Sequence, residues 1–139
     1  MNARKGAVTK KAKEWLRHAD EDLLLAKHAF KLKTSVPFKL IAYHAQQCAE
    51  KCLKAYLVYH EIDFPFTHNL SSLLELCPLP VDQITVLEKA NILSAYAITA
   101  RYPGTYKVTK REAVRSVQLA EQVRSVIRAV LKAEGMKIA

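Results

Sequence analysis

The sequence has little glycine, and it has no long apolar run. Three glycines and five prolines in 139 residues, half of which are apolar, exclude a low-complexity chain and argue against an all-β fold. No stretch reaches the about 20 apolar residues of a membrane-spanning helix, and the basic start lacks the hydrophobic segment of a signal peptide. We therefore expect no membrane association, and one helical domain at residues 9–135 after a flexible basic tail at residues 1–8.

Cysteine is also scarce, and the three cysteines do not form a disulfide framework. Cys48 and Cys52 are one helical turn apart on an apolar face and Cys77 is left over, so we expect reduced thiols and a cytoplasmic location. His44, Cys48 and Cys52 share a spacing that could present metal ligands, but a closed zinc site needs a fourth ligand. Small buried cysteines that fill space explain the pattern, and we expect no metal and no cofactor.

Positive charge is plentiful and concentrated in two parts of the chain. The formal net charge is +9, with six Lys/Arg against Glu14 in residues 1–17 and nine against three acids in residues 101–137. Such clustering favours a phosphate-bearing or acidic partner, with a solvated basic surface as the alternative.

Apolar residues recur at helical spacing over five segments. The periodicity predicts helices at about residues 9–32, 38–60 and 69–76, a fourth helix of about 19 residues that Asp82 caps, and a last helix that Gly135 ends. Thr67 or Asn69 is the expected cap of the short helix, and Thr109 with Glu112 forms a capping box. The expected fold is all-α: an up-down-up-down antiparallel four-helix bundle with a short additional helix.

The segment 38–60 has an apolar arc over about half of the helix circumference. This width predicts a central bundle helix, or one that also contacts a second chain. The opposite side carries a polar stripe that we expect to face water or a polar partner: Tyr43, Gln46, Gln47, Glu50, Lys51 and Lys54.

Antiparallel connections bring four helix ends to one pole of this bundle. The cations expected there are Lys27, Lys31, Lys33, Lys39, Arg101, Lys107, Lys110 and Arg111. The second basic cluster, from the N-terminal segment and the late part of the last helix, lies at the opposite pole. Arg101 is on the inner side of its helix, which favours either a structural ion pair or a guanidinium that binds an anion.

Tyr102 and Tyr106 flank Pro103-Gly104 among these cations. Aromatic rings between cations suit base stacking with phosphate contacts, and rings packed on the bundle end are the alternative. We therefore predict a nucleotide or RNA site that consists of Lys39, Arg101, Tyr102, Tyr106, Lys107, Lys110 and Arg111. His68 could serve as an acid–base group or as a helix cap.

Four segments together resemble the HEPN family, small helical domains often encoded beside a minimal nucleotidyltransferase in prokaryotes. They are Trp15 to Ala26 with Asp20 and Asp22, Ala45-Gln-Gln-Cys-Ala-Glu-Lys-Cys-Leu-Lys-Ala55, His68-Asn-Leu-Ser-Ser-Leu-Leu74 and Ala100-Arg-Tyr-Pro103. The resemblance covers nearly the whole chain, and the combination is more specific than any one part.

The resemblance implies an up-down bundle that forms a homodimer and associates with nucleotides, RNA or a nucleotidyltransferase. Many members of the family are metal-independent ribonucleases with an arginine followed, four to six residues later, by a histidine. Here Tyr106, Lys107 and Val108 follow Arg101 at those positions, so the histidine is missing.

Three hypotheses follow for the function. The first, which we predict, is a nucleotide- or RNA-binding module or nucleotidyltransferase partner in a toxin–antitoxin-like pair. The second is a ribonuclease toxin in which another base, with His68 as the candidate, works beside Arg101. The third is a dimerisation scaffold, and whether the chain is an enzyme stays open at this point.

Overall fold

The computed structural model describes residues 3–100, 102–104 and 106–138. This part of the chain contains helices and loops and no strand: α1 (Ala3–Ala29), α2 (Phe38–Tyr59), α3 (Leu70–Leu76), α4 (Val81–Glu88), the 3-10 helix η1 (Lys89–Leu93), α5 (Ser94–Thr99) and α6 (Lys110–Ala133). The all-α fold class that the sequence predicts is therefore confirmed. Within the described ranges no helix is both long and apolar enough to cross a membrane.

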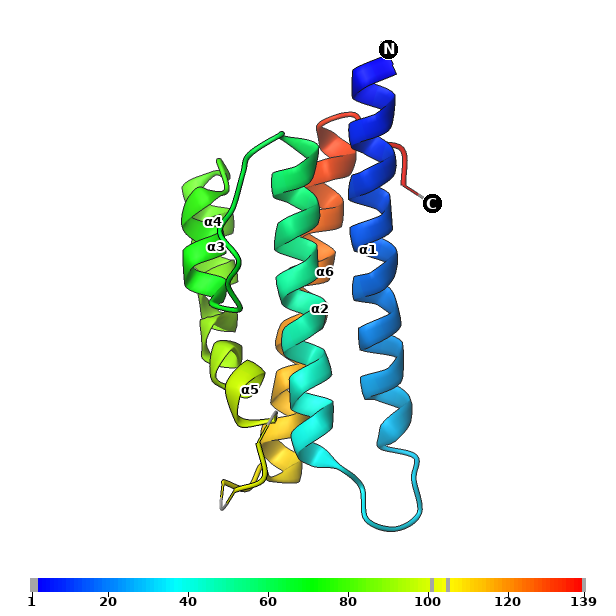
Figure 1. Ribbon diagram of the computed structural model, residues 1–139, viewed down its shortest axis with the longest axis vertical. Helices are drawn as coiled ribbons and strands as arrows, with labels where there is room; N and C mark the ends of the chain where they lie inside the picture. Colours follow the sequence, from blue (N-terminus) through cyan, green and yellow to red (C-terminus); the bar gives the residue numbers. More distant parts are fainter. Residues whose placement is uncertain (1–2, 101, 105, 139) are drawn as a thin grey trace.

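The long helices run antiparallel to one another (Figure 1). The chain descends through α1, returns through α2, descends again through α4, η1 and α5, and ascends through α6 to the end where α1 begins. The short α3 connects α2 to α4. This is the predicted up-down-up-down order with one short additional helix.

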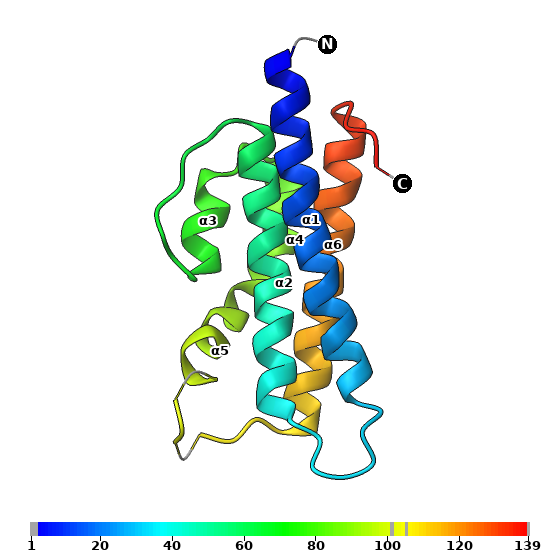
Figure 2. The ribbon, with the colours of Figure 1, turned by 45° about the vertical axis from the view of Figure 1, so that its right-hand side comes forward.

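The central element is α2, which packs against α1, α3, α5 and α6 (Figures 1 and 2). Small buried residues such as Ala42, Ala45 and Ala49 let its neighbours approach closely. The wide apolar face is thus covered within one chain, as expected of a central bundle helix.

The first helix begins earlier than the sequence predicts. Residues 3–8, expected to be a flexible tail, form the first turns of α1. Two contacts anchor them to the end of α2: Arg4 Nε lies 2.7 Å from Glu61 Oε1, and Lys5 Nζ lies 3.7 Å from the centre of the Tyr59 ring. These partners are more than 50 residues away in sequence, so local composition could not reveal them.

The predicted fourth helix is not continuous. It consists of α4, one tighter 3-10 turn and α5, which bends the segment around α2 and α6. The bend keeps Ala90 and Leu93 in the core, and Ser94 Oγ accepts the N–H of Leu70 at 2.9 Å. Packing and this hydrogen bond to the start of α3 outweigh the local preference for one straight helix.

The helix ends follow local rules in most places. Asn69 Oδ1 accepts the N–H of Ser72 at 3.2 Å, and Gly135 ends α6 with φ of 101°. Asp82 is not the cap of α4: the helix begins at Val81, directly after Pro80, and no side chain caps it. The fixed φ of proline defines that start, and Asp82 lies in the first turn.

Candidate functional site

The loop between α5 and α6 and the first turn of α2 meet at one end of the bundle (Figure 2). Lys39 Nζ donates a hydrogen bond of 3.3 Å to the carbonyl oxygen of Tyr102. The contact joins two of the segments from which the sequence predicts a nucleotide or RNA site. Arg101, the central residue of that prediction, lies outside the described residues.

Two tyrosines of this loop are open to solvent. Tyr102 is 67% exposed and Tyr106 is 51% exposed, so neither is sealed against the bundle end as the alternative interpretation expects. Val108 is buried and attaches the loop to the core. The nearby cations Lys107, Lys110 and Arg111 are exposed as well.

A hydrogen-bonded cap fixes where α6 begins. Thr109 Oγ1 accepts the N–H of Glu112 at 3.1 Å, which is one half of the predicted capping box. The Glu112 carboxylate instead accepts the hydroxyl of Tyr96 at 3.1 Å. Burial and this hydrogen bond raise the pKa of Tyr96 to about 12, so the hydroxyl remains a neutral donor. Both ends of the tyrosine loop are therefore held in place.

Not every cation expected at this end lies beside the loop. Lys27 Nζ pairs with Glu121 Oε2 at 3.0 Å, and Glu121 lies in the middle of α6, away from the loop. Lys31 and Lys33 are exposed in the connection between α1 and α2. The segments meet as antiparallel helices require, but the charges spread over the end of the bundle.

The polar stripe of α2 is largely inside the molecule. Glu50 is only 3% exposed, and Gln46, Gln47 and Lys54 are buried beside it. Of the two alternatives for this side of α2, water or a polar partner, the structure excludes water for these four residues. The segment from the end of α2 to α3 returns along α2 and covers them (Figure 1), which helical periodicity alone could not indicate.

Glu50 is the centre of this buried cluster. Its two carboxylate oxygens accept hydrogen bonds from Lys54 Nζ at 2.9 Å and from Gln46 Nε2 at 3.1 Å, and His68 Nδ1 lies 2.8 Å from Oε1. Burial by itself raises the pKa of Glu50, but the hydrogen bonds from Lys54, Gln46 and His68 outweigh it and hold the pKa below its usual value.

His68, the predicted acid–base candidate, is part of this cluster. Its ring is held by Glu50, and its carbonyl oxygen accepts Gln46 Nε2 at 3.0 Å. The cap of α3 is the neighbouring Asn69 instead. These contacts give His68 a role in holding the segment before α3 on α2.

A second polar cluster, which the sequence did not predict, joins α1 to α2. Asp22 Oδ1 lies 2.9 Å from His44 Nδ1, and Oδ2 accepts Lys51 Nζ at 2.6 Å. Burial raises the pKa of Asp22, but the contacts with His44 and Lys51 outweigh this and lower it. Tyr43 and Lys51 remain half-buried, and a partner contact there stays a prediction.

The cysteines of α2 are part of the core. The thiols of Cys48 and Cys52 are free and fully buried, and Cys77 is also buried and free. His44 engages Asp22 on the side of α1. In the residues that the structure describes, no three histidine, cysteine or acidic side chains come together as a metal-binding group.

A family model and a relative each match most of the chain. The model of the HEPN domain matches residues 12–130. A Methanocaldococcus jannaschii protein named "Putative toxin MJ1304" is 30% identical over 150 aligned positions, which cover 95% of this chain and 96% of that protein.

Two solved structures are similar over most of the chain. The crystal structure of TT1696 from Thermus thermophilus has a TM-score of 0.69 at 25% identity, and the match covers 86% of this chain and 97% of that one. ST0689, described as an archaeal HEPN homologue, has a TM-score of 0.63 at 26% identity, and the match covers 85% of this chain and 95% of that one.

Proposed function

The chain belongs to the HEPN domain family, and we propose that it has a toxin-like role that depends on binding a nucleotide or an RNA segment. The observation that carries the proposal is the loop between α5 and α6, where Tyr102 and Tyr106 are exposed beside Lys107. The toxin-like part rests on the name of the M. jannaschii relative.

The chemistry of the loop suits a nucleotide. An exposed aromatic ring provides a surface for stacking a base, and each stacked base contributes about 1–3 kcal/mol to binding. Lys107, Lys110 and Arg111 supply the positive charge that phosphates need. The Lys39 contact and the buried Val108 hold the loop at its two ends, which reduces the entropy lost on binding.

Two protein partners belong to the proposal: a second copy of this chain and a minimal nucleotidyltransferase. Light scattering of the purified chain tests the first, because a homodimer has twice the mass of the 15.7 kDa chain. Mixing the chain with the product of an adjacent nucleotidyltransferase gene and measuring the mass again tests the second. A monomer that forms no complex would leave only the ligand-binding part of the proposal.

A ribonuclease is the second candidate, and the toxin name of the relative is what favours it. The positions after Arg101 lack a histidine, and His68 is held by Glu50. We therefore expect purified protein to leave RNA intact in a gel assay with a chelator present. Cleavage that Arg101→Ala abolishes would overturn the binding-only proposal and establish the ribonuclease.

The binding site is tested by titration of labelled RNA and of nucleotides. We expect Arg101→Ala combined with Lys107→Ala to weaken binding at least about tenfold, because each substitution removes one phosphate contact. A matched control combines Lys11→Ala with Lys89→Ala, two exposed cations away from the loop. If both double variants bind like the unchanged protein, the proposed site is wrong.

A further inference from the structure

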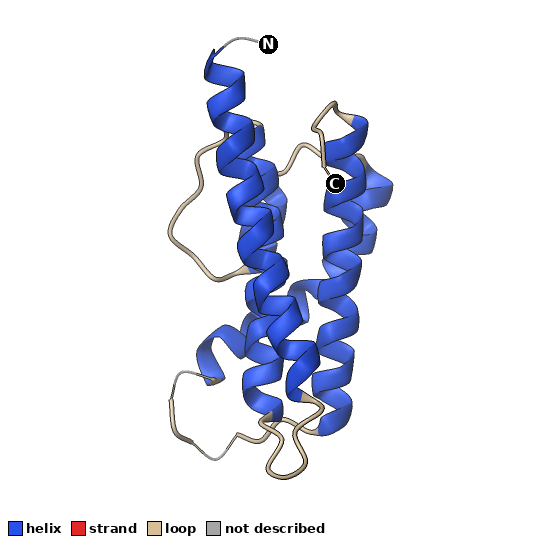
Figure 3. Ribbon diagram, turned by 90° about the vertical axis from the view of Figure 1, so that its right-hand side faces the viewer, coloured by secondary structure: helices blue, strands red, loops and turns tan. Residues whose placement is uncertain are grey.

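A basic groove lies between α1 and α6, away from the tyrosine loop. The two helices diverge toward the end of the molecule that holds both termini (Figure 3). Two hollows, of about 610 Å³ and about 270 Å³, are lined by residues of both helices, and Asp20 lines both of them. They therefore adjoin and form one elongated groove.

The walls of the groove carry more cations than acids. The larger hollow is lined by Lys27 and Arg124, with Asp20 and Glu121 as its acids. Of the described residues, the smaller hollow adds four cations and no further acid: Lys13, Arg17, Arg128 and Lys137. The cations of the smaller hollow belong to the second basic cluster that the sequence predicts, and they border a concave surface.

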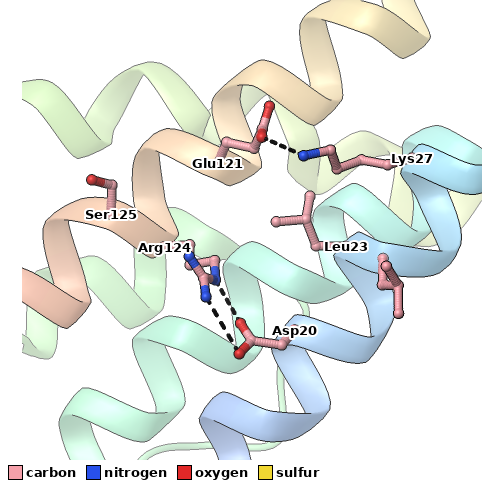
Figure 4. Close-up of a pocket in the computed structure, with 7 residues that line it drawn as sticks. Asp20, Leu23, Lys27, Glu121, Arg124 and Ser125 are labelled. Carbon is pink, nitrogen blue, oxygen red and sulfur yellow. Dashed lines mark hydrogen bonds and ion pairs between the residues drawn. The ribbon is translucent and has the colours of Figure 1, made fainter. Parts of the chain in front are cut away.

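The two acids are already neutralised within the chain (Figure 4). Arg124 Nε donates to Asp20 Oδ1 at 2.6 Å. Outside the close-up, Arg128 Nη1 lies 3.5 Å from Asp20 Oδ2. Lys27 pairs with Glu121 across the other part of the groove. Arg124 and Arg128 thus share one carboxylate at Asp20.

Three further cations lack an acid partner in the part of the chain that the structure describes. Among the described residues, no carboxylate lies within ion-pair distance of Lys13, Arg17 or Lys137. Lys137 is brought to the groove by the C-terminal segment, which turns at Gly135 and is anchored by the buried Met136. Cations that converge from three segments repel one another, so an anion in the groove would relieve an unfavourable interaction.

The length of the groove indicates the kind of anion. From Lys13 to Asp20, beside which Arg124 and Arg128 lie, the rise along α1 is about 10 Å, at about 1.5 Å per residue. One phosphate cannot reach all of these cations. The charges line hollows between helices, which a flexible strand can enter and a rigid duplex cannot.

We propose that the groove between α1 and α6 binds the phosphodiester backbone of single-stranded nucleic acid. Lys13, Arg17 and Lys137 contact successive phosphates, and Arg124 and Arg128, which share the Asp20 carboxylate, border the same groove. Apolar side chains at the groove, among them the exposed Leu24 and the half-buried Ile138, offer surfaces for unstacked bases. This site is separate from the tyrosine loop and does not depend on the proposed function.

The test is fluorescence anisotropy of a labelled single-stranded RNA of about 12 nucleotides, a length within the range bound by single-strand-binding domains. Titrations run at several salt concentrations. The groove variant is Lys13→Glu with Arg17→Glu. The matched control is Lys11→Glu with Lys89→Glu, which has the same net charge and changes exposed cations outside the groove lining.

We expect the groove variant to bind about tenfold or more weakly, and the slope of log K against log salt to flatten by about 1.4, or about 0.7 for each lost phosphate contact. The control variant retains most of the affinity. Equal weakening in both variants would mean that net charge alone attracts RNA, and unchanged binding by the groove variant would equally overturn the proposal.

A second variant, which should bind RNA more tightly, tests the groove in a way that misfolding cannot imitate. Asp20→Asn keeps the shape of the side chain and removes the charge that Arg124 and Arg128 share, so we expect RNA to bind several-fold more tightly. Weaker or unchanged binding by this variant would contradict the role given to the two arginines. A matching single-stranded DNA should bind similarly, because the contacts are to the backbone.

A nucleoside triphosphate separates the groove from the tyrosine loop. The groove variant should keep its affinity for the triphosphate and lose affinity for the RNA strand. The opposite result, in which the groove variant binds the triphosphate more weakly and RNA as before, would contradict the proposal. The groove would then be a mononucleotide site. If the loop variants Arg101→Ala and Lys107→Ala change nothing and the groove variant weakens RNA binding, the groove stands and the proposed function fails.

Discussion

His68 Nδ1 lies 2.8 Å from Glu50 Oε1, and this contact joins the segment before α3 to the middle of α2. The ammonium of Lys54 donates to the other oxygen of the same carboxylate at 2.9 Å. It also lies 5.5 Å from the centre of the Trp15 ring and 5.6 Å from that of Phe64. The buried pair of Glu50 and Lys54 thus connects α1, α2 and the returning loop.

Replacement of that acid should destabilise the fold. Glu50→Gln removes the charge and leaves the buried Lys54 ammonium without its anion, so we expect a loss of about 3 kcal/mol in the free energy of unfolding. Urea unfolding at neutral pH measures it. The control Glu61→Gln breaks the exposed pair with Arg4 and should change stability by less than about 1 kcal/mol. Equal effects would show that burial does not distinguish the two pairs.

Low pH should reduce the free energy of unfolding through protonation of Glu50. The pKa of Glu50 in the folded chain lies below its usual 4.5, so the unfolded chain binds more protons in the interval between the two values. The stabilisation is therefore fully present above pH 4.5 and is lost as the pH falls through the folded pKa.

Unfolding curves of Glu50→Gln at several pH values should show a weaker decline in stability below pH 4.5 than the unchanged chain. Part of the decline remains in this variant, because the pKa of Asp22 is lowered as well. A variant that loses stability in acid as steeply as the unchanged chain would contradict the assignment to Glu50.

The N-terminal cap of α6 should contribute to the stability of the fold. Thr109→Ala removes the acceptor of the Glu112 N–H and should reduce the free energy of unfolding by about 1 kcal/mol. Thr85→Ala is the control, because Thr85 Oγ1 only donates to the carbonyl oxygen of Val81 within α4. Thermal or urea unfolding compares the two, and a smaller loss for Thr109→Ala than for Thr85→Ala would be the opposite of what we expect.

The exposed tyrosines make a prediction about binding. Tyr102→Ala and Tyr106→Ala should each weaken RNA binding about tenfold if a base stacks on each ring. Tyr102→Phe and Tyr106→Phe keep the ring and should bind nearly as well as the unchanged chain. Loss of binding by the phenylalanine variants as well would point to the hydroxyl groups and against stacking.

Some features could be predicted because their causes lie within a few residues. The cap at Asn69, the cap at Thr109 and the turn at Gly135 each depend on neighbouring backbone groups, and the structure has all three. The centrality of α2 follows from its wide apolar face in the same way, because the width of that face reflects the number of neighbours.

Other features depended on partners that are distant in sequence. The break at η1 places Leu93 in the core and Ser94 against α3, and helical periodicity continues through both residues. Arg124 and Arg128 are one turn apart on a helix with many cations, and only the approach of Asp20 on α1 gives them a shared anion. The spacing of the two arginines could be read from the sequence, but the neighbouring helix that they face could not.

The sequence alone determined an all-helical chain, the order of its long helices, the central role of α2 and the two concentrations of positive charge. Each of these follows from composition and from the spacing of residues along one helix. The tertiary structure decided that Glu50 and Lys54 are buried under a returning loop, and that the cations of α1 and α6 border a groove. The reason is physical: burial and ion pairing depend on which surfaces meet, and helices separated by many residues meet only when the chain is folded.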